Sequence, residues 1–168
     1  MFEVSMQFDD INISSIENED LECIQNWLNL EQEFNAENSL EFQDLYKRFL
    51  EYYASECEFF LKISKHNRLI GIIKGRIEFK NPNEVWFSFY LLDSKERGSG
   101  QGSRILNNII KCFNESYGIS NFFVVALANE VGMLKFLKKN KFDLQRVSKN
   151  FYSIEGSYKD MLLLRRGE

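Results

Sequence analysis

The most informative stretch of the sequence is Arg97-Gly98-Ser99-Gly100-Gln101-Gly102-Ser103, in which three of seven residues are glycine. It follows the aromatic and aliphatic run from Val85 to Leu92, which has the composition of a central strand covered on both faces. After it, apolar residues recur at helical spacing from Ile105 to Tyr117. The pattern therefore predicts a buried strand, a short glycine-rich loop and an amphipathic helix in succession.

This succession is typical of an anion site. Small residues let the backbone fold around an anion, and the N–H groups of a helix's first turn point toward it, with the helix dipole adding to the attraction. Two common phosphate loops fit poorly. A Walker A loop needs Gly-Lys-Ser/Thr, but Gly102 is followed by Ser103 and Arg104, and a dinucleotide fingerprint needs glycine where Ser103 stands. A nucleotide-binding loop is therefore the weaker alternative.

The elements around the loop predict one α+β domain, without an internal repeat or a linker. Before the loop we expect a strand at Glu3–Phe8, helices that start near Ser14 and Asn38, strands at 59–64 and 69–79, and turns at His66-Asn67 and Asn81-Pro82-Asn83. After it we expect a fully buried strand at Phe122–Ala128, a helix at Asn129–Asn140, strands at Phe142–Val147 and Tyr158–Leu164, and a turn at Glu155-Gly156. The predicted architecture is a three-layer sandwich, a mixed and largely antiparallel sheet with helices on both faces.

The pattern Arg-x-x-Gly-x-Gly, formed by Arg97, Gly100 and Gly102, resembles the coenzyme A loop of the GNAT acetyltransferases. The resemblance extends over residues 58–166. It implies a single domain, 1–168, whose residues 1–57 bind an amine acceptor and whose residues 58–168 bind acetyl-CoA. The contacts that it implies for the cofactor are a strand bulge at Leu91 and Leu92, the loop residues Arg97, Gly98, Ser99, Gly100, Gln101, Gly102 and Ser103, the helix-opening Asn129, and the aromatic Phe136.

Three further features bear on this resemblance. Phe142 matches the closing phenylalanine of the family, but Asn140-Lys141 stands where the family usually has glycine. The segment from Glu155 to Asp160 resembles the C-terminal strand of the branch that acetylates polyamines and ribosomal-protein N-termini. Many members carry a proton-donating tyrosine in the second helix, where this chain has Phe136 and Leu137, so a water or another tyrosine would protonate the leaving thiolate.

The resemblance implies direct attack of a neutral amine on the thioester, with a backbone N–H at Leu91 or Leu92 facing the developing negative oxygen. Glu84 and Glu78 flank the central strands and are the candidate general bases, and Tyr152 is a candidate acid, with Tyr158 as its alternative. Each of these residues has an ordinary structural explanation as well: solvation for the glutamates and packing for the tyrosines. His66, the one histidine, fits a solvated turn, and we expect no metal.

Charge is divided unevenly along the chain. Residues 1–60 hold 15 acidic and 2 basic side chains, and the other 108 hold 10 acidic and 19 basic, within a net charge of −4. The acidic part would attract a cationic acceptor such as a polyamine or amino-sugar, and the basic part a polyanionic cofactor. A solvated acidic helix pair is the structural alternative, and a peptide N-terminus is the alternative acceptor.

Composition excludes several other classes of protein. The acidic balance argues against nucleic-acid binding, no apolar run is long enough to span a bilayer, and three scattered cysteines fit a reduced compartment. We therefore expect a cytoplasmic enzyme, and a homodimer is compatible with the sequence. Two rival interpretations remain open: a non-catalytic acetyl-CoA sensor, and a partner-binding surface on the N-terminal helices around Tyr46, Phe49 and Tyr53.

Overall fold

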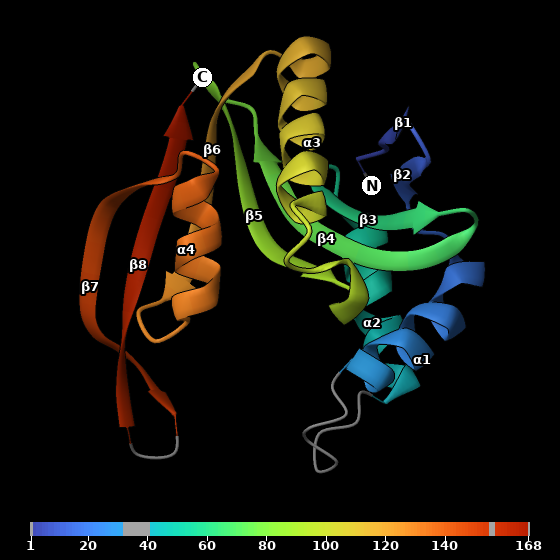
Figure 1. The fold of residues 1–168 in the computed structure, drawn as a ribbon, viewed down its shortest axis with the longest axis horizontal. Coiled ribbons are helices and arrows are strands. Elements are labelled where there is room, and N and C mark those ends of the chain that lie inside the picture. The colour runs from blue at the N-terminus through green and yellow to red at the C-terminus, as the bar shows by residue number, and fades with distance from the viewer. Residues whose placement is uncertain (1, 32–40, 155–156, 168) are drawn as a thin grey trace. The chain divides into compact units, whose positions relative to one another are not determined.

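The computed structural model describes residues 2–31, 41–154 and 157–167. Within them, eight strands form one sheet in the order β1-β2-β3-β4-β5-β6-β8-β7, accompanied by four α-helices (Figure 1). The β5–β6 pair is parallel, and β1–β2, β2–β3, β3–β4, β6–β8 and β7–β8 are antiparallel. The predicted fold class, a mixed and largely antiparallel sheet with helices, is confirmed. The chain divides into two compact units, Met1–Arg76 with Phe89–Gly102, and Ile77–Ser88 with Ser103–Glu168.

The first unit is built on the N-terminal strands and the first two helices. Its elements are β1 (Ser5–Phe8), β2 (Ile11–Ser15), the 3-10 helix η1 (Asn18–Asp20), α1 (Leu21–Glu31), α2 (Phe42–Ala54), β3 (Glu58–Lys65), most of β4 (Arg68–Glu78), the end of β5 (Asn83–Leu92) and the 3-10 helix η2 (Ser94–Glu96). Leu21, Ile24 and Leu28 recur at helical spacing on α1, and they pack with Leu45 and Phe49 of α2 in one buried cluster. The two helices therefore bury their apolar faces together.

The start of the chain differs from the prediction in one element. Ser14 and Glu17 were predicted to open a helix, but Ile11–Ser15 is a strand that pairs with both β1 and β3. The cap is formed three residues later, where the Glu17 side chain accepts from the Asp20 N–H and the Asp20 side chain accepts from the Glu17 N–H. The alternation of buried Ile11 and Ile13 fits a strand that has one covered face. The predicted helix start at Asn38 lies outside the described residues, and α2 begins at Phe42.

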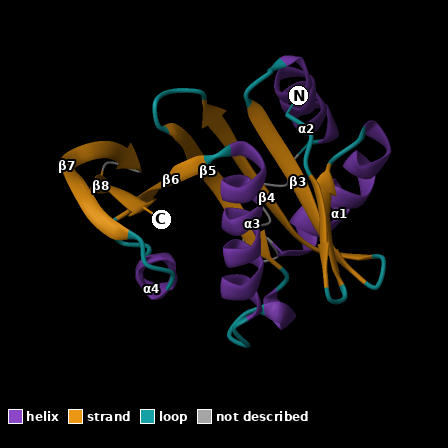
Figure 2. Ribbon diagram, turned by 90° about the horizontal axis from the view of Figure 1, so that it is seen from above, coloured by secondary structure: helices purple, strands orange, loops and turns teal. Residues whose placement is uncertain are grey.

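The second unit combines the remaining strands with the last two helices. Its elements are the end of β4, the start of β5, α3 (Gln101–Tyr117, from Ser103 onward), β6 (Ile119–Leu127), α4 (Val131–Lys139), β7 (Asp143–Ile154) and β8 (Ser157–Gly167). Helices α3 and α4 lie on the same face of the strands of this unit (Figure 2). The buried stripe of α3, from Ile105 through Ile109 to Phe113, confirms the predicted helix.

Two strands are less buried than predicted. In β5, Val85 and Phe87 are buried, but Ser88 is exposed and Phe89 is 42% exposed. In β6, Val125 is 45% exposed. The prediction that both faces of these strands are covered is therefore wrong. An unbroken apolar run can belong to a strand with only one packed face, because composition does not say which face a helix covers.

The predicted turn at His66-Asn67 is confirmed. These residues adopt φ of 49° and 61° in the two-residue turn between β3 and β4. In the strand that follows, the backbone approaches Gly71 closely: an added Cβ there would lie 2.7 Å from the Leu91 carbonyl oxygen. The predicted turn at Glu155-Gly156 lies outside the described residues, and the strands on either side of it are longer than predicted.

Candidate active site

The glycine-rich loop is open on the side where side chains would stand. Gly98 and Gly100 adopt φ of 77° and 88°, a conformation that favours glycine, and an added Cβ at either position would meet nothing within 4 Å. Glycine is needed here for the backbone conformation, and the space above the loop stays free. Helix α3 begins at Gln101, so Gln101, Gly102 and Ser103, predicted as loop, form its first turn. This geometry suits an anion that accepts hydrogen bonds from backbone N–H groups.

Two polar side chains of the loop have different roles. The Ser99 hydroxyl donates to the Glu96 carbonyl oxygen at 2.9 Å and accepts from the Gln101 N–H at 3.4 Å, so it braces the turn. The Gln101 amide nitrogen is buried and has no hydrogen-bond partner in the described part of the chain. An unsatisfied buried donor costs free energy, and an acceptor atom on a bound ligand would satisfy it. The residues of the loop therefore fit a polyanionic cofactor.

Arg97, the first residue of the motif, is already engaged. Its Nε donates to the Leu92 carbonyl oxygen at 2.7 Å, and its Nη2 donates to Glu31 Oε2 at 2.6 Å. The guanidinium thereby ties the entrance of the loop to the end of β5 and to the end of α1. Arg97 was predicted as a cofactor contact, and in this structure its bonds brace the loop.

Tyr90 connects the end of β5 with the first turn of α3. Its hydroxyl donates to the Gly102 carbonyl oxygen at 3.0 Å. Burial raises the pKa of the Tyr90 hydroxyl far above its ordinary value, because an anionic phenolate would lose its hydration. The hydroxyl is therefore a permanent donor at physiological pH. Sequence analysis missed this residue, and the only signal for it was an aromatic near the end of the strand.

The backbone at Leu91 and Leu92 lies close to β4. Leu92 is buried and Leu91 packs on the core of the first unit, while Gly71 provides the space that the Leu91 carbonyl occupies. Just beyond, the Asp93 N–H donates to the Ile70 carbonyl oxygen at 2.8 Å. The pairing register between β5 and β6 ends at Phe87 and Val124, although β5 continues to Leu92. A bulge at Leu91 and Leu92 remains a prediction.

In the second unit, Asn140 joins α3 to the end of α4. Its side chain is buried, and its Nδ2 donates to Ser103 Oγ at 3.0 Å and to the Phe136 carbonyl oxygen at 2.8 Å. Asn107 Nδ2 donates to Asn140 Oδ1 at 3.2 Å. Arg166 of β8 donates to the Asn140 carbonyl oxygen. Ser103, a predicted cofactor contact, is thereby held at the first turn of α3.

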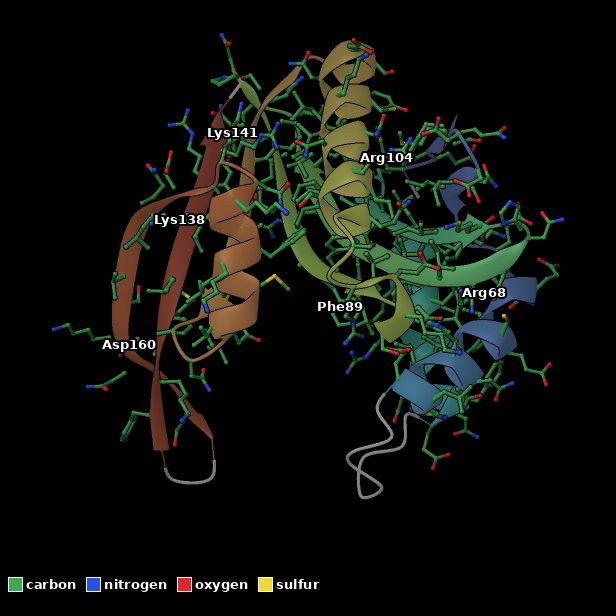
Figure 3. All side chains as sticks on the ribbon, in the orientation of Figure 1. Arg68, Phe89, Arg104, Lys138, Lys141 and Asp160 are labelled. Carbon is green, nitrogen blue, oxygen red and sulfur yellow. The ribbon has the colours of Figure 1, made fainter. Side chains whose placement is uncertain are left out.

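The remaining predicted contacts of this unit lie around α4. Asn129 is exposed in the turn before the helix, where its carbonyl oxygen accepts from the Val131 N–H, and Phe136 is half-buried on α4. Phe142 is buried. Lys141, where the family usually has glycine, adopts a φ of 63° after the C-terminal end of α4, the conformation that glycine provides without strain (Figure 3).

The acidic residue of the C-terminal motif has a structural role. Asp160, labelled on β8 in Figure 3, accepts from the Asn150 N–H at 2.9 Å through its carboxylate. Its carbonyl oxygen accepts from the Ala128 N–H at 3.0 Å. Asn150 adopts a φ of 51° where the β7–β8 register shifts. Asp160 therefore fixes this irregularity of β7.

The candidate bases share one cation. Lys80 forms ion pairs with Glu78 and with Glu84, the second at 3.2 Å. The hydrogen bond to Glu78, and after it the one to Glu84, raises the pKa of the Lys80 ammonium. Glu84 stands near the start of β5 and Leu91 stands seven residues later, near its end. Because a strand advances about 3.3 Å per residue, about 20 Å of strand separate the two residues. Tyr152 lies on β7 opposite Lys159, and its side chain is outside the described part.

Two other candidates lie on the surface. The side chain of His66 is 78% exposed and lies 3.9 Å from Asp10, and Tyr158 is 67% exposed on β8. Neither side chain is held in a buried arrangement that would fix a proton near a reacting atom. Among the described residues no cluster of three or more His, Cys, Asp or Glu could hold a metal ion.

Comparison with protein families matches the acetyltransferase (GNAT) domain over residues 13–163. The chain belongs to the GNAT acetyltransferase family. No curated protein matches the chain. The family resemblance stated from the sequence is therefore confirmed, and the nucleotide-binding alternative is wrong.

Solved structures with the same fold include two kinds of acetyltransferase. An enzyme from Salmonella typhimurium that modifies the N-terminal serine of ribosomal protein L7/L12 superposes with a TM-score of 0.82 at 15% identity, over 96% of each chain. Ribosomal-protein-S5-alanine acetyltransferase from Vibrio fischeri superposes with a TM-score of 0.76 at 19% identity. The match covers 98% of this chain and 96% of that one. Spermidine N-acetyltransferase from Vibrio cholerae, in complex with CoA and spermine, superposes with a TM-score of 0.78 at 15% identity. The match covers 94% of this chain and 95% of that one.

The family defines the class of reaction. The chain is an acetyl-CoA-dependent N-acetyltransferase with an amine as acceptor, so the interpretation as a non-catalytic sensor is set aside. None of the helices in the described ranges combines the length and apolar character that crossing a bilayer requires.

Proposed function

We propose that this enzyme transfers the acetyl group of acetyl-CoA to a primary amine of a cationic small molecule of the polyamine or amino-sugar type. The observation that supports this acceptor is the excess of 13 acidic side chains within residues 1–60. The acceptor-side helices carry exposed acids, among them Glu22, Glu41, Asp44 and Glu51. A field of this sign raises the local concentration of a polycation and speeds its association.

Some of the acidic residues in this part are neutralised internally. Asp20 binds Lys62 at 2.7 Å, Asp10 lies 3.7 Å from Lys65, and Glu31 binds Arg97. In each pair the cation comes from the basic part of the chain. The charge available to an acceptor is therefore smaller than the composition suggests, but it keeps its sign.

We place the pyrophosphate of the cofactor on the N–H groups of the loop from Gly98 to Gly102 and of the first turn of α3. Acetyl-CoA supplies an acetyl group activated as a thioester. The backbone at Leu91 and Leu92 positions that group, and Gln101 is available as a donor to the cofactor. Ser103, Asn129 and Phe136 are the proposed contacts of the second unit.

The amine must lose a proton before it attacks, because a lysine-like amine with a pKa of about 10 is protonated at neutral pH. The proposed bases are Glu84 and Glu78, and the proposed acid is Tyr152. Glu84 lies seven strand positions before Leu91, so a chain of several waters would carry the proton to it. General-base help is worth about 10²–10⁴-fold in rate. If Glu84→Gln and Glu78→Gln each change kcat by less than about threefold, both glutamates leave the mechanism and solvent takes the proton.

A second acceptor class is favoured by the surface of α2. Phe42, Tyr46, Leu50 and Tyr53 are between 39% and 59% exposed along one side of this helix. Phe49, which was predicted to belong to the same surface, is buried in the core instead. Exposed apolar side chains at this spacing suit a peptide segment, and the ribosomal-protein acetyltransferases of the same fold modify protein N-termini. A homodimer remains a prediction.

The test is an acetyl-transfer assay with spermidine, an aminoglycoside, a basic peptide, a peptide with an uncharged N-terminal segment, and neutral amino acids. The proposal expects the largest kcat/KM for the polycations, and a fall of about tenfold between 20 and 300 mM NaCl, because salt screens exposed charges. Faster transfer to both peptides would support the second acceptor class. Equal rates for neutral amino acids and polycations would remove the charge argument.

A further inference from the structure

A glutamate at the end of α1 holds the segment that leads into the glycine-rich loop. Glu31 accepts from the Ser94 N–H, with N···O distances of 3.2 Å to both carboxylate oxygens, and lies 3.4 Å from the Ser94 hydroxyl. Arg97 Nη2 donates to the same carboxylate at 2.6 Å. Only 12% of the Glu31 side chain is accessible to solvent. Arg97 is 49% accessible, so the Glu31 carboxylate is the shielded partner of this pair.

The same segment has a second set of charged contacts. Arg68 lies 3.5 Å from Asp93 and 3.2 Å from Glu96, and 54% of its side chain is accessible, against 49% for Arg97. Lys65 also lies 3.7 Å from Glu96. These ion pairs reach side chains only, whereas Glu31 also accepts from the backbone N–H of Ser94, so Glu31 fixes the backbone of the turn directly.

We infer that Glu31 is a positioning residue for acetyl-CoA: its carboxylate fixes Ser94 and Arg97 and so sets the direction in which the loop from Gly98 to Gly102 presents its N–H groups. This inference rests on the proposed placement of the pyrophosphate on that loop. Glu31 acts through its two partners and touches no reacting atom. Because it ends α1, the contact also ties a helix of the acceptor side to the cofactor loop.

The geometry explains why the glutamate matters for binding more than for chemistry. A flexible loop would have to be ordered when the cofactor binds, at the expense of affinity, and a loop held beforehand avoids that cost. The attachment is made at Ser94 and Arg97, ahead of Gly98, where the chain becomes conformationally permissive. Glycines supply the required conformations, and the bonds of Glu31 restrict the chain to them.

The experiment compares Glu31→Ala and Glu31→Gln with Asn26→Ala, which changes an exposed, uncharged side chain of the same helix. Calorimetry gives the Kd for acetyl-CoA, and steady-state kinetics give KM for acetyl-CoA and kcat. Glu31→Ala should raise Kd and KM about tenfold, the factor of one charge-assisted hydrogen bond, with kcat at saturating acetyl-CoA changed less than about twofold. The Kd and KM of Glu31→Gln should lie between those of the wild type and Glu31→Ala, because the amide oxygen of glutamine still accepts from Ser94. Asn26→Ala should match the wild type within about twofold.

Further measurements separate positioning from a general structural role. Amide exchange at Ser94 should accelerate about tenfold in Glu31→Ala, while Tm stays within about 3 °C of the wild type. A fall of kcat in step with affinity, or unchanged Kd in both Glu31 variants, overturns the inference. Should Glu31→Ala not fold, the isosteric Glu31→Gln decides by the same criteria, with an expected rise in Kd of about threefold.

Gly100→Glu distinguishes the failure of this inference from the failure of the proposed cofactor site. That substitution places bulk and negative charge where the pyrophosphate is proposed to bind, so it should abolish acetyl-CoA binding. If it does and the Glu31 variants bind normally, only the role of Glu31 is refuted. If Gly100→Glu binds acetyl-CoA as well as the wild type, the placement of the cofactor itself is wrong.

Discussion

Replacement of Asn140 by alanine should destabilise the protein more than any exposed asparagine does. The side chain is 3% exposed, and it makes hydrogen bonds to Ser103 Oγ, to the Phe136 carbonyl oxygen and from Asn107 Nδ2. Each hydrogen bond contributes about 1 kcal/mol net, and Asn107 lies near solvent, where water can replace its partner. We therefore expect a loss of about 2–3 kcal/mol in the free energy of unfolding.

Urea unfolding followed by far-UV circular dichroism measures this change in free energy. Thermal unfolding should show a fall in Tm of about 5–10 °C for a chain of this length. The matched control is Asn108→Ala. Asn108 lies on α3 beside Asn107, and its amide donates to the Arg104 carbonyl oxygen at the exposed surface. This control should change stability by less than about 0.5 kcal/mol. A loss below about 1 kcal/mol for Asn140→Ala would refute the view that its bonds close the end of α4 and, through Ser103 and Asn107, hold it against α3.

Three further changes test single backbone or side-chain features. Gly71→Ala should lower the free energy of unfolding in urea by about 1–3 kcal/mol, because its Cβ would lie 2.7 Å from the Leu91 carbonyl oxygen. Gly132→Ala has free space around its Cβ and should be neutral or stabilising. Equal effects of the two substitutions would contradict the close approach at Gly71. Lys141→Gly should stabilise the protein by up to about 1 kcal/mol, measured by thermal unfolding, because the φ of 63° at this position strains a lysine and not a glycine. A loss of stability would show that the lysine side chain contributes more than its strained backbone costs. Since burial raises the pKa of Tyr90 above its unfolded value of 10.0, its contribution to stability is present below pH 10 and declines as pH rises beyond it. Tyr90→Phe should flatten that decline in unfolding curves between pH 8 and 11, and an unchanged slope would exclude Tyr90 as its cause.

Much of the site could be predicted because its signals are local. The glycines of the loop and the apolar period of α3 lie within about twenty consecutive residues, and each follows from backbone or helix geometry. The turn at His66-Asn67 is of the same kind, since its residues tolerate positive φ. By contrast, β2 was missed because Ser14 and Glu17 also fit a helix cap, and only pairing with β1 and β3 selects the strand.

Sequence alone therefore determined the family, the fold class, the glycine-rich loop before α3 and the uneven distribution of charge. Tertiary structure decided which polar side chains support that loop. Glu31 precedes Arg97 by 66 residues, and Asn140 follows Ser103 by 37. Pairs so far apart leave no periodicity in the chain, and their partners are chosen by how the helices and strands pack in the folded protein. A buried polar group takes the partner that packing brings within reach, and that choice exists only in the folded chain.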